Sequence, residues 1–102
     1  MSHPLLSVLD LSVGDPVLVK SVGMGIHVGR LAGCEGRAVA LTDSRHIRSW
    51  SGVGGSGSLY HLAVSTATPA DRGPVMERQL MLDCDGVIPL SPASWAALGE
   101  AP

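Results

Sequence analysis

Short apolar runs separated by turn residues repeat along the first half of the chain. Residues 17–20 read Val-Leu-Val-Lys, residues 26–31 read Ile-His-Val-Gly-Arg-Leu, and residues 37–42 read Arg-Ala-Val-Ala-Leu-Thr. Runs of about four to eight residues that are rich in aliphatic side chains and bounded by Gly, Pro or Asp are typical of strands. The glycine-containing links between these runs are short enough for hairpins. We therefore expect three antiparallel strands in a meander.

A fourth strand is predicted over residues 45–50, after a break at Asp43 and Ser44. Residues 51–58 are half glycine, which is typical of a flexible loop. A short helix is expected over residues 59–64, because a serine precedes it and its apolar positions would share one side.

The last third of the chain predicts two more strands and a helix. Residues 66–74 are polar with two prolines and are expected to form a surface loop, and residues 75–82 return as a strand. The pair Asp85 and Gly86 then predicts a hairpin turn that leads into a strand over residues 87–90, where Pro89 indicates an edge strand. A serine followed by a proline opens the final helix, residues 92–98.

This order predicts a mainly β (α+β) fold. We expect a small, strongly bent antiparallel sheet or a partly open barrel, with one short central helix and a C-terminal helix. The 102 residues suffice for one domain, residues 1–102, but not for two separate cores. Thirteen Gly and seven Pro exclude a helical bundle. With two Trp, one Tyr and no Phe, the core must be aliphatic.

Charge and cysteine content narrow the classes of function. The formal net charge of −2 gives the whole molecule no electrostatic attraction to duplex nucleic acid. No apolar run approaches the roughly 18 residues that span a bilayer, and the first residues lack the pattern of a signal peptide, so we expect a cytoplasmic protein without membrane contact. Cys34 and Cys84 have no CxxC spacing and are expected to be reduced thiols. No zinc or other cofactor is predicted.

The strongest chemical signal lies in and after the predicted fourth strand. Because side chains alternate along a strand, His46, Arg48 and Trp50 would share one face, opposite Ile47. An outward indole beside a guanidinium suits a phosphate-bearing ring compound, with stacking on the indole and a bidentate pair to the phosphate. The predicted ligand-binding residues are Arg45, His46, Arg48, Trp50, Ser51 and Gly52, with Arg30 and His27 at the rim.

Two other interpretations of Trp50 remain open at this stage. Its side chain would pack in the core if the strand were turned the other way. An outward Trp with Arg is also what protein interfaces are enriched in, so the face would then bind a second copy of the chain. The letters GxGxxG occur at residues 52–57, but the chain is too short for a dinucleotide-binding fold.

Catalysis has little support in the sequence. Asp43, His46 and either Ser44 or Ser49 supply the letters of a triad, but residues this close on one strand cannot generally form the necessary relay. We therefore expect that the protein is not an enzyme.

The front half of the chain carries a recognisable series of motifs. Residues 17–20, 23–31 and 36–41 are followed by residues 44–52, Ser-Arg-His-Ile-Arg-Ser-Trp-Ser-Gly, with two basic residues, an aliphatic residue and a Trp. Together with the strand pair at residues 81–83 and 87–89, they resemble a family of short bacteriophage and prophage proteins of uncharacterised function, over roughly two-thirds of the chain.

The resemblance implies no catalytic residue. Two departures from the family pattern fall in the predicted site. Arg48 and Ser49 stand where the family has aromatic residues before the Trp, and residues 54–57 look like an insertion.

These observations favour a phage or prophage accessory protein in the host cytoplasm. We expect it to bind and sequester a small phosphorylated, nucleotide-derived ligand, such as an immune signal, without converting it. In such an anti-defence sponge, a homo-oligomer would enclose the ligand. The alternative is a protein–protein interaction or structural module that uses the same face. A further alternative is single-stranded nucleic-acid binding, which the negative charge and the few aromatic residues favour least.

Overall fold

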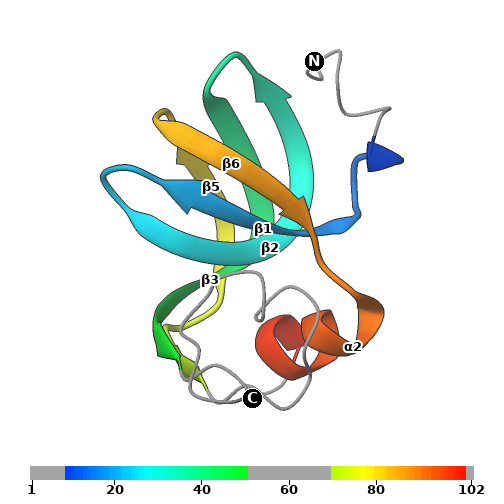
Figure 1. The fold of residues 1–102 in the computed structure, drawn as a ribbon, viewed down its shortest axis with the longest axis vertical. Helices are drawn as coiled ribbons and strands as arrows, with labels where there is room; N and C mark the ends of the chain where they lie inside the picture. The colour runs from blue at the N-terminus through cyan, green and yellow to red at the C-terminus, as the bar shows by residue number, and fades with distance from the viewer. Residues whose placement is uncertain (1–8, 51–69, 101–102) are drawn as a thin grey trace.

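The computed structural model describes residues 9–50 and 70–100, apart from the side chains of Trp50 and Ala70 (Figure 1). The chain forms one antiparallel sheet followed by a short helix. The strands are β1 (Pro16–Ser21), β2 (Gly25–Glu35), β3 (Ala38–Trp50), β4 (Ala70–Arg72), β5 (Met76–Met81) and β6 (Cys84–Pro89). The helix α2 (Pro92–Trp95) continues into a π-helical turn, η3 (Ala96–Glu100).

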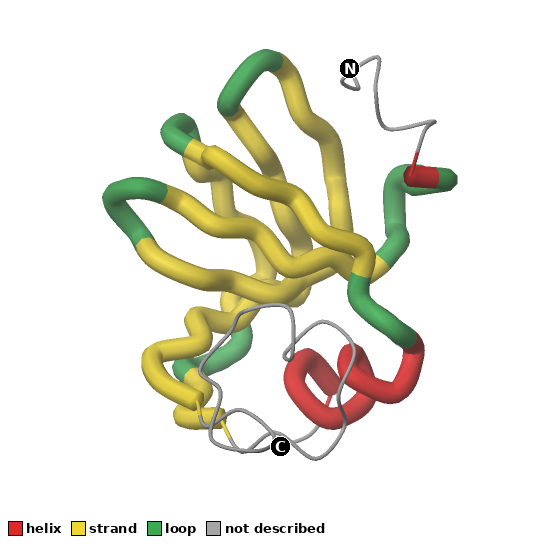
Figure 2. The backbone as a smooth tube through the Cα atoms, in the orientation of Figure 1, coloured by secondary structure: helices red, strands yellow, loops and turns green. Residues whose placement is uncertain are grey.

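The sheet curls because β5 and β6, which only residues 82 and 83 separate, pair at opposite sides of the sheet, β5 with β3 and β6 with β1. The strand order is β4-β3-β2-β1-β6, and β5 lies beside β4 along the same edge of β3. Figure 2 shows the sheet curled over on itself, with the helical segment below it. The predicted bent antiparallel sheet is confirmed, and it is not closed. Pro89 lies on β6, which pairs only with β1 on this path, as expected for an edge strand.

Strand β1 is buried on both faces and divides two cores. Val17 and Val19 point into the curl of the sheet, and Leu18 points toward the helix. The core inside the curl holds Val17, Val19, Leu31, Cys34, Val39, Leu41, Met81 and Cys84. The core under the helix holds Leu18, Ile26, Val28, Ile47, Leu90, Trp95 and Leu98.

The predicted break at residues 43 and 44 is wrong, since β3 runs through it as one strand. Asp43 has a positive φ of 50°, a conformation that Asp tolerates better than most residues. On either side of it, Thr42 pairs with Arg78 and Ser44 with Met76, so the β5 ladder continues across the kink. One long bent strand therefore replaces the predicted third and fourth strands.

Other boundaries differ from the prediction or fall outside the described residues. β6 begins at Cys84, so the predicted hairpin turn at Asp85 and Gly86 is wrong, and both residues lie within the strand. β2 extends through Glu35, because the turn sits at Gly36, where φ is 58°. β4 lies within the predicted loop at residues 66–74 and pairs with the end of β3. The predicted loop at residues 51–58 and the helix at residues 59–64 lie outside the described residues.

The predicted C-terminal helix is present, with the expected cap. Ser91 Oγ accepts a hydrogen bond of 3.1 Å from Ser94 N, and Pro92 occupies the first turn. Trp95 is buried in the core under the helix, so this helix supplies an aromatic side chain to an otherwise aliphatic core.

Candidate functional site

The structure separates the residues of the predicted ligand face on β3. Arg45 is buried, whereas the half-buried ring of His46 points the other way and stacks on His27 at a centroid distance of 4.8 Å. The backbone of Trp50 pairs with Ala70, but its side chain is not described. Ser51 and Gly52 lie outside the described residues. The structure thus brings His46 to His27 rather than to Arg48.

Three arginines at the end of β3 and on β4 bind groups of the same chain. Arg45 Nε donates to the carbonyl oxygen of Gly73 at 2.9 Å. Arg48 Nη2 forms an ion pair with Asp71 at 2.8 Å and also donates to the carbonyl of Arg72. These contacts tie β4 and the segment after it to β3.

Arg72 connects this edge of the sheet to the terminal helix. Its Nη1 donates to the carbonyl oxygens of Ala97 at 2.9 Å and Leu98 at 3.4 Å, which lie in the final helical turn. Burial lowers the pKa of Arg45, and the nearby positive charge of Arg72 lowers it further.

Arg30, which was predicted at the rim of the ligand face, lies over Trp95 of the core under the helix. Its guanidinium carbon is 5.1 Å from the centroid of the Trp95 ring, within the range of a cation–π contact. Arg30 Nη1 also donates to the carbonyl of Gly14, and its Nε lies 4.0 Å from Asp43. These contacts make Arg30 a cover for the indole of Trp95.

His27 and His46 belong to a polar cluster inside the curl, which also includes Ser44 and Gln79. Ser44 Oγ donates to Gln79 Oε1 at 2.9 Å, and Gln79 Nε2 lies 3.3 Å from His27 Nε2. The amide nitrogen of Gln79 can only donate, so His27 Nε2 accepts and the ring is neutral with its proton on Nδ1. That Nδ1 is buried, and among the described residues it has no hydrogen-bond partner.

Burial lowers the pKa of His27, and the neighbouring imidazole of His46 lowers it further, while the backbone at Gly25 partly offsets both. Ser44 has no exposed surface, so it cannot attack a substrate. The cluster therefore has the features of an internal hydrogen-bonded network, not of a catalytic site. Sequence reasoning missed Gln79. The available signal was the alternation of side chains on the predicted strand, which places Gln79 on the same face as Met81 and opposite Leu80.

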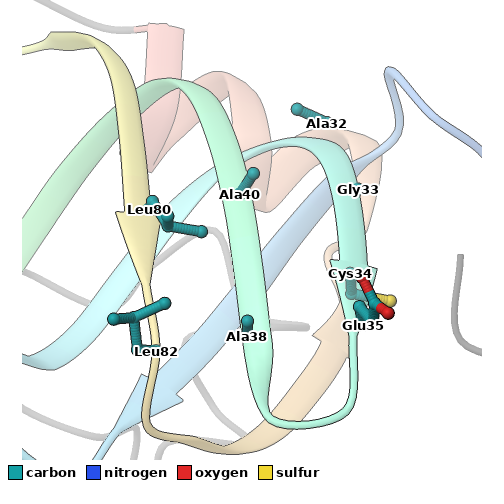
Figure 3. A pocket seen from close by; sticks show the side chains of 8 residues that line it. All are labelled: Ala32, Gly33, Cys34, Glu35, Ala38, Ala40, Leu80 and Leu82. Carbon is teal, nitrogen blue, oxygen red and sulfur yellow. The ribbon is translucent and has the colours of Figure 1, made fainter. Parts of the chain in front are cut away.

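An apolar face lies on the outside of β2, β3 and β5 (Figure 3). Leu80 and Leu82 are 60 % and 71 % exposed. They stand beside a floor of small residues, to which Ala38 and Ala40 of β3 contribute, and the resulting shallow groove has a volume of about 460 Å³. We call this surface the Leu80 face and define it by Ala32, Gly33, Glu35, Ala38, Ala40, Arg78, Leu80 and Leu82.

The two ends of the Leu80 face carry opposite charges. Arg78 lies at the level of Thr42, and Glu35 lies at the level of Ala38, two register steps further along β3. Among the described residues, neither Arg78 nor Glu35 has an ion-pair or hydrogen-bond partner. The other basic side chains, all of which are described, each have a partner (Lys20, Arg30, Arg37, Arg45, Arg48 and Arg72).

Comparison with known proteins places the chain in a family. Residues 14–98 match the family model described as Domain of unknown function (DUF6948). The chain belongs to the DUF6948 family. This confirms the expectation of a family of uncharacterised function, while a bacteriophage origin stays a prediction. No curated protein and no solved structure matches the chain.

The residues that match the family model include all the described strands of the DUF6948 domain and most of its last helical segment. Within residues 9–50 and 70–100, no three His, Cys, Asp or Glu side chains are grouped so as to hold a metal ion. Cys34 and Cys84 are buried and are not joined by a disulfide, and burial together with Asp83 and Asp85 raises the pKa of Cys84. In the same part of the DUF6948 chain, no helix has the length and apolarity needed to cross a membrane.

Proposed function

We propose that this DUF6948 protein is a non-catalytic interaction module that binds a protein partner through the Leu80 face. The observation that carries the proposal is the exposure of two leucines at the end of β5: Leu80 is the last outward residue of the strand, and Leu82 follows the strand directly. A strand with one solvent-facing side ordinarily places polar residues outward and apolar residues inward. Here Leu80 and Leu82 face solvent, while Gln79 points inward to Ser44 and His27.

Exposed leucines beside an alanine floor are costly in an isolated protein and useful in a complex. Burial of an aliphatic side chain that was in contact with water contributes free energy in proportion to its apolar area. Contiguous apolar patches rimmed by polar residues are typical of protein interaction sites. The small residues of the floor leave room for side chains from a partner, and the two leucines offer the complementary ridge.

The charges at the ends of the face specify the chemistry of the partner. A protein that fits would present aliphatic side chains to the groove, an acidic group to Arg78 and a basic group to Glu35. The two charged groups have no competing ion pair among the described residues, so a partner need not break one. Complementary charges of this kind fix orientation more than they add affinity.

Site-specific photo-crosslinking tests this proposal in the cells that make the protein. A photoreactive benzoyl-phenylalanine at position 80 is expected to give a discrete protein adduct, which mass spectrometry then identifies. The matched control places the same group at Val13, which is 69 % exposed and is not among the residues that define the face. The adduct should disappear in the Arg78→Glu background. Equal labelling from both positions, or none from position 80, would contradict the proposal.

A second candidate function is capture of a small phosphorylated ligand at the arginine end of β3. The observation that favours it is that Arg45, Arg48 and Arg72 lie together where the end of β3 pairs with β4. In that function the protein would be a phage or prophage accessory protein of the host cytoplasm that sequesters a nucleotide-derived signal. A homo-oligomer would enclose the ligand.

A thermal-shift panel of cyclic dinucleotides, cyclic trinucleotides and cyclic ADP-ribose isomers tests this second candidate. Binding is expected to raise the unfolding temperature by mass action, and Arg48→Gln should remove the shift. Stabilisation by none of these compounds in a folded sample would exclude capture of this class of ligand.

A further inference from the structure

The Leu80 face is complementary to itself in both shape and charge. Its ridge is made of Leu80 and Leu82, and its floor is made of small residues. Its two charges, which have no ion pair within residues 9–50 and 70–100, have opposite signs. A surface with these properties can be its own partner if one rotation brings ridge to floor and cation to anion. The strand register allows that rotation to be worked out.

The register places the outward residues on a simple grid. Ala40 lies opposite Leu80 on one side and Gly33 on the other. Arg78 pairs with Thr42, one step toward one end of this row. Glu35 pairs with Ala38, one step toward the other end. Because neighbouring strands lie about 4.8 Å apart and alternate residues about 7 Å apart, Arg78 and Glu35 occupy opposite corners of the face.

We propose that the partner on the Leu80 face is a second copy of this chain. The two copies are related by a two-fold axis in the plane of the interface, which passes midway between these two corners and is perpendicular to the line that joins them. The proposal rests on the function proposed above and names its partner. The rotation carries Arg78 of one copy onto Glu35 of the other, and the reverse. It also carries Leu80 onto Ala38 of the other copy and sets the two Leu82 side chains against each other near the axis.

The arrangement has the features of ordinary sheet packing. The strands of the two copies cross at nearly a right angle, one of the two preferred geometries for packed sheets. Each leucine ridge then meets small side chains, so the two surfaces interlock instead of colliding. The contact is isologous, so it closes as a dimer and does not propagate. Since the patch is small, the dimer is expected to be reversible.

Sedimentation velocity of the purified full chain, over a range of about 5 to 500 μM, tests this arrangement. We expect a concentration-dependent shift from monomer to dimer. Arg78→Glu and Glu35→Arg are each expected to weaken dimerisation by at least about tenfold, because each places like charges together at both ends of the interface. The matched control is Glu77→Arg, which reverses an exposed charge on the same strand next to Arg78 and should leave dimerisation unchanged.

Mixing the two charge-reversed variants gives the sharpest test. In a mixture, an Arg78→Glu chain and a Glu35→Arg chain would form a heterodimer with two favourable charge pairs, so association should return. An effect of these residues within one chain would not be rescued by mixing. Circular dichroism of each variant separates a loss of association from a loss of fold.

The outcomes separate this inference from the proposed function. A chain that stays monomeric throughout the range, or a dimer that Arg78→Glu does not weaken, overturns the two-fold arrangement. If the position-80 crosslinker then captures a different identified protein in the cell, the interaction module stands with another partner. If it captures nothing, both proposals fail.

Discussion

His27 links one buried side chain to the acidity of the solution. Its ring is 4 % exposed, accepts from Gln79 through Nε2 and stacks on His46. A charged imidazolium at this position would lose hydration, would face the amide donor of Gln79 and would stand beside a second imidazole. The folded protein therefore favours the neutral ring.

This preference gives the free energy of unfolding a defined dependence on pH. The pKa of His27 is lowered on folding from 6.5, so between the lowered value and 6.5 the unfolded chain binds more protons than the folded one. Stability from this group is complete above about pH 6.5 and falls as the pH drops toward the folded pKa. Urea unfolding between pH 7.5 and 5 is expected to show this decline, and His27→Gln is expected to flatten it. Equal pH slopes for the two proteins would contradict the assignment.

Strand β3 organises the sheet because it bends without ending. It pairs with β2 along one edge and with both β5 and β4 along the other. The bend falls at Asp43, the residue with positive φ inside this strand. Through this bend, the same strand contributes Val39 and Leu41 to the core inside the curl and Ile47 to the core under the helix.

Substitutions at Asp43 should therefore depend on backbone conformation rather than on charge. Asp43→Val is expected to cost about 1–2 kcal/mol, because a β-branched residue is strained at this φ. Asp43→Asn keeps a residue that tolerates the conformation and removes the charge near Arg30, so it should stay within about 0.5 kcal/mol of the wild type. Urea unfolding measures both. A loss for Asn as large as the loss for Val would assign the role to the charge instead.

The sequence predicted the elements better than their continuity. Apolar periodicity and turn residues located most strands and the cap at Ser91, since these signals are local. The continuation of β3 through Asp43 was missed, because ladder bonds to β2 and β5, which are remote in sequence, hold the kink. The three residues of β4 were missed for the same reason, as they depend on pairing with the end of β3.

The candidate site was harder to predict than the fold. Simple alternation on residues 45–50 separated His46 from Ile47, but it could not show that the His46 side points into the curl toward His27. Nor could it show that the buried Arg45 donates to Gly73. The Leu80 face depends on three strands that meet only in the folded sheet, so its alanine floor carried no local signal.

At the scale of the whole molecule, two small cores stabilise the sheet from opposite sides. One core fills the curl and the other lies under the helix, and both are built mainly from aliphatic residues. A chain of this size buries a smaller share of its surface than a large domain does. Association through the Leu80 face would add buried apolar area at a place where the isolated chain leaves leucines in water.

Hydroxyl-radical footprinting of the intact protein at low and high concentration tests this account most directly. At high concentration we expect protection of Leu80 and Leu82, while Val13 and Val22, exposed at 69 % and 61 %, stay reactive. Dilution should restore the reactivity of the two leucines. If Leu80 and Leu82 remain as reactive as Val13 at every concentration and in the presence of every identified partner, this face is not the binding surface of the protein.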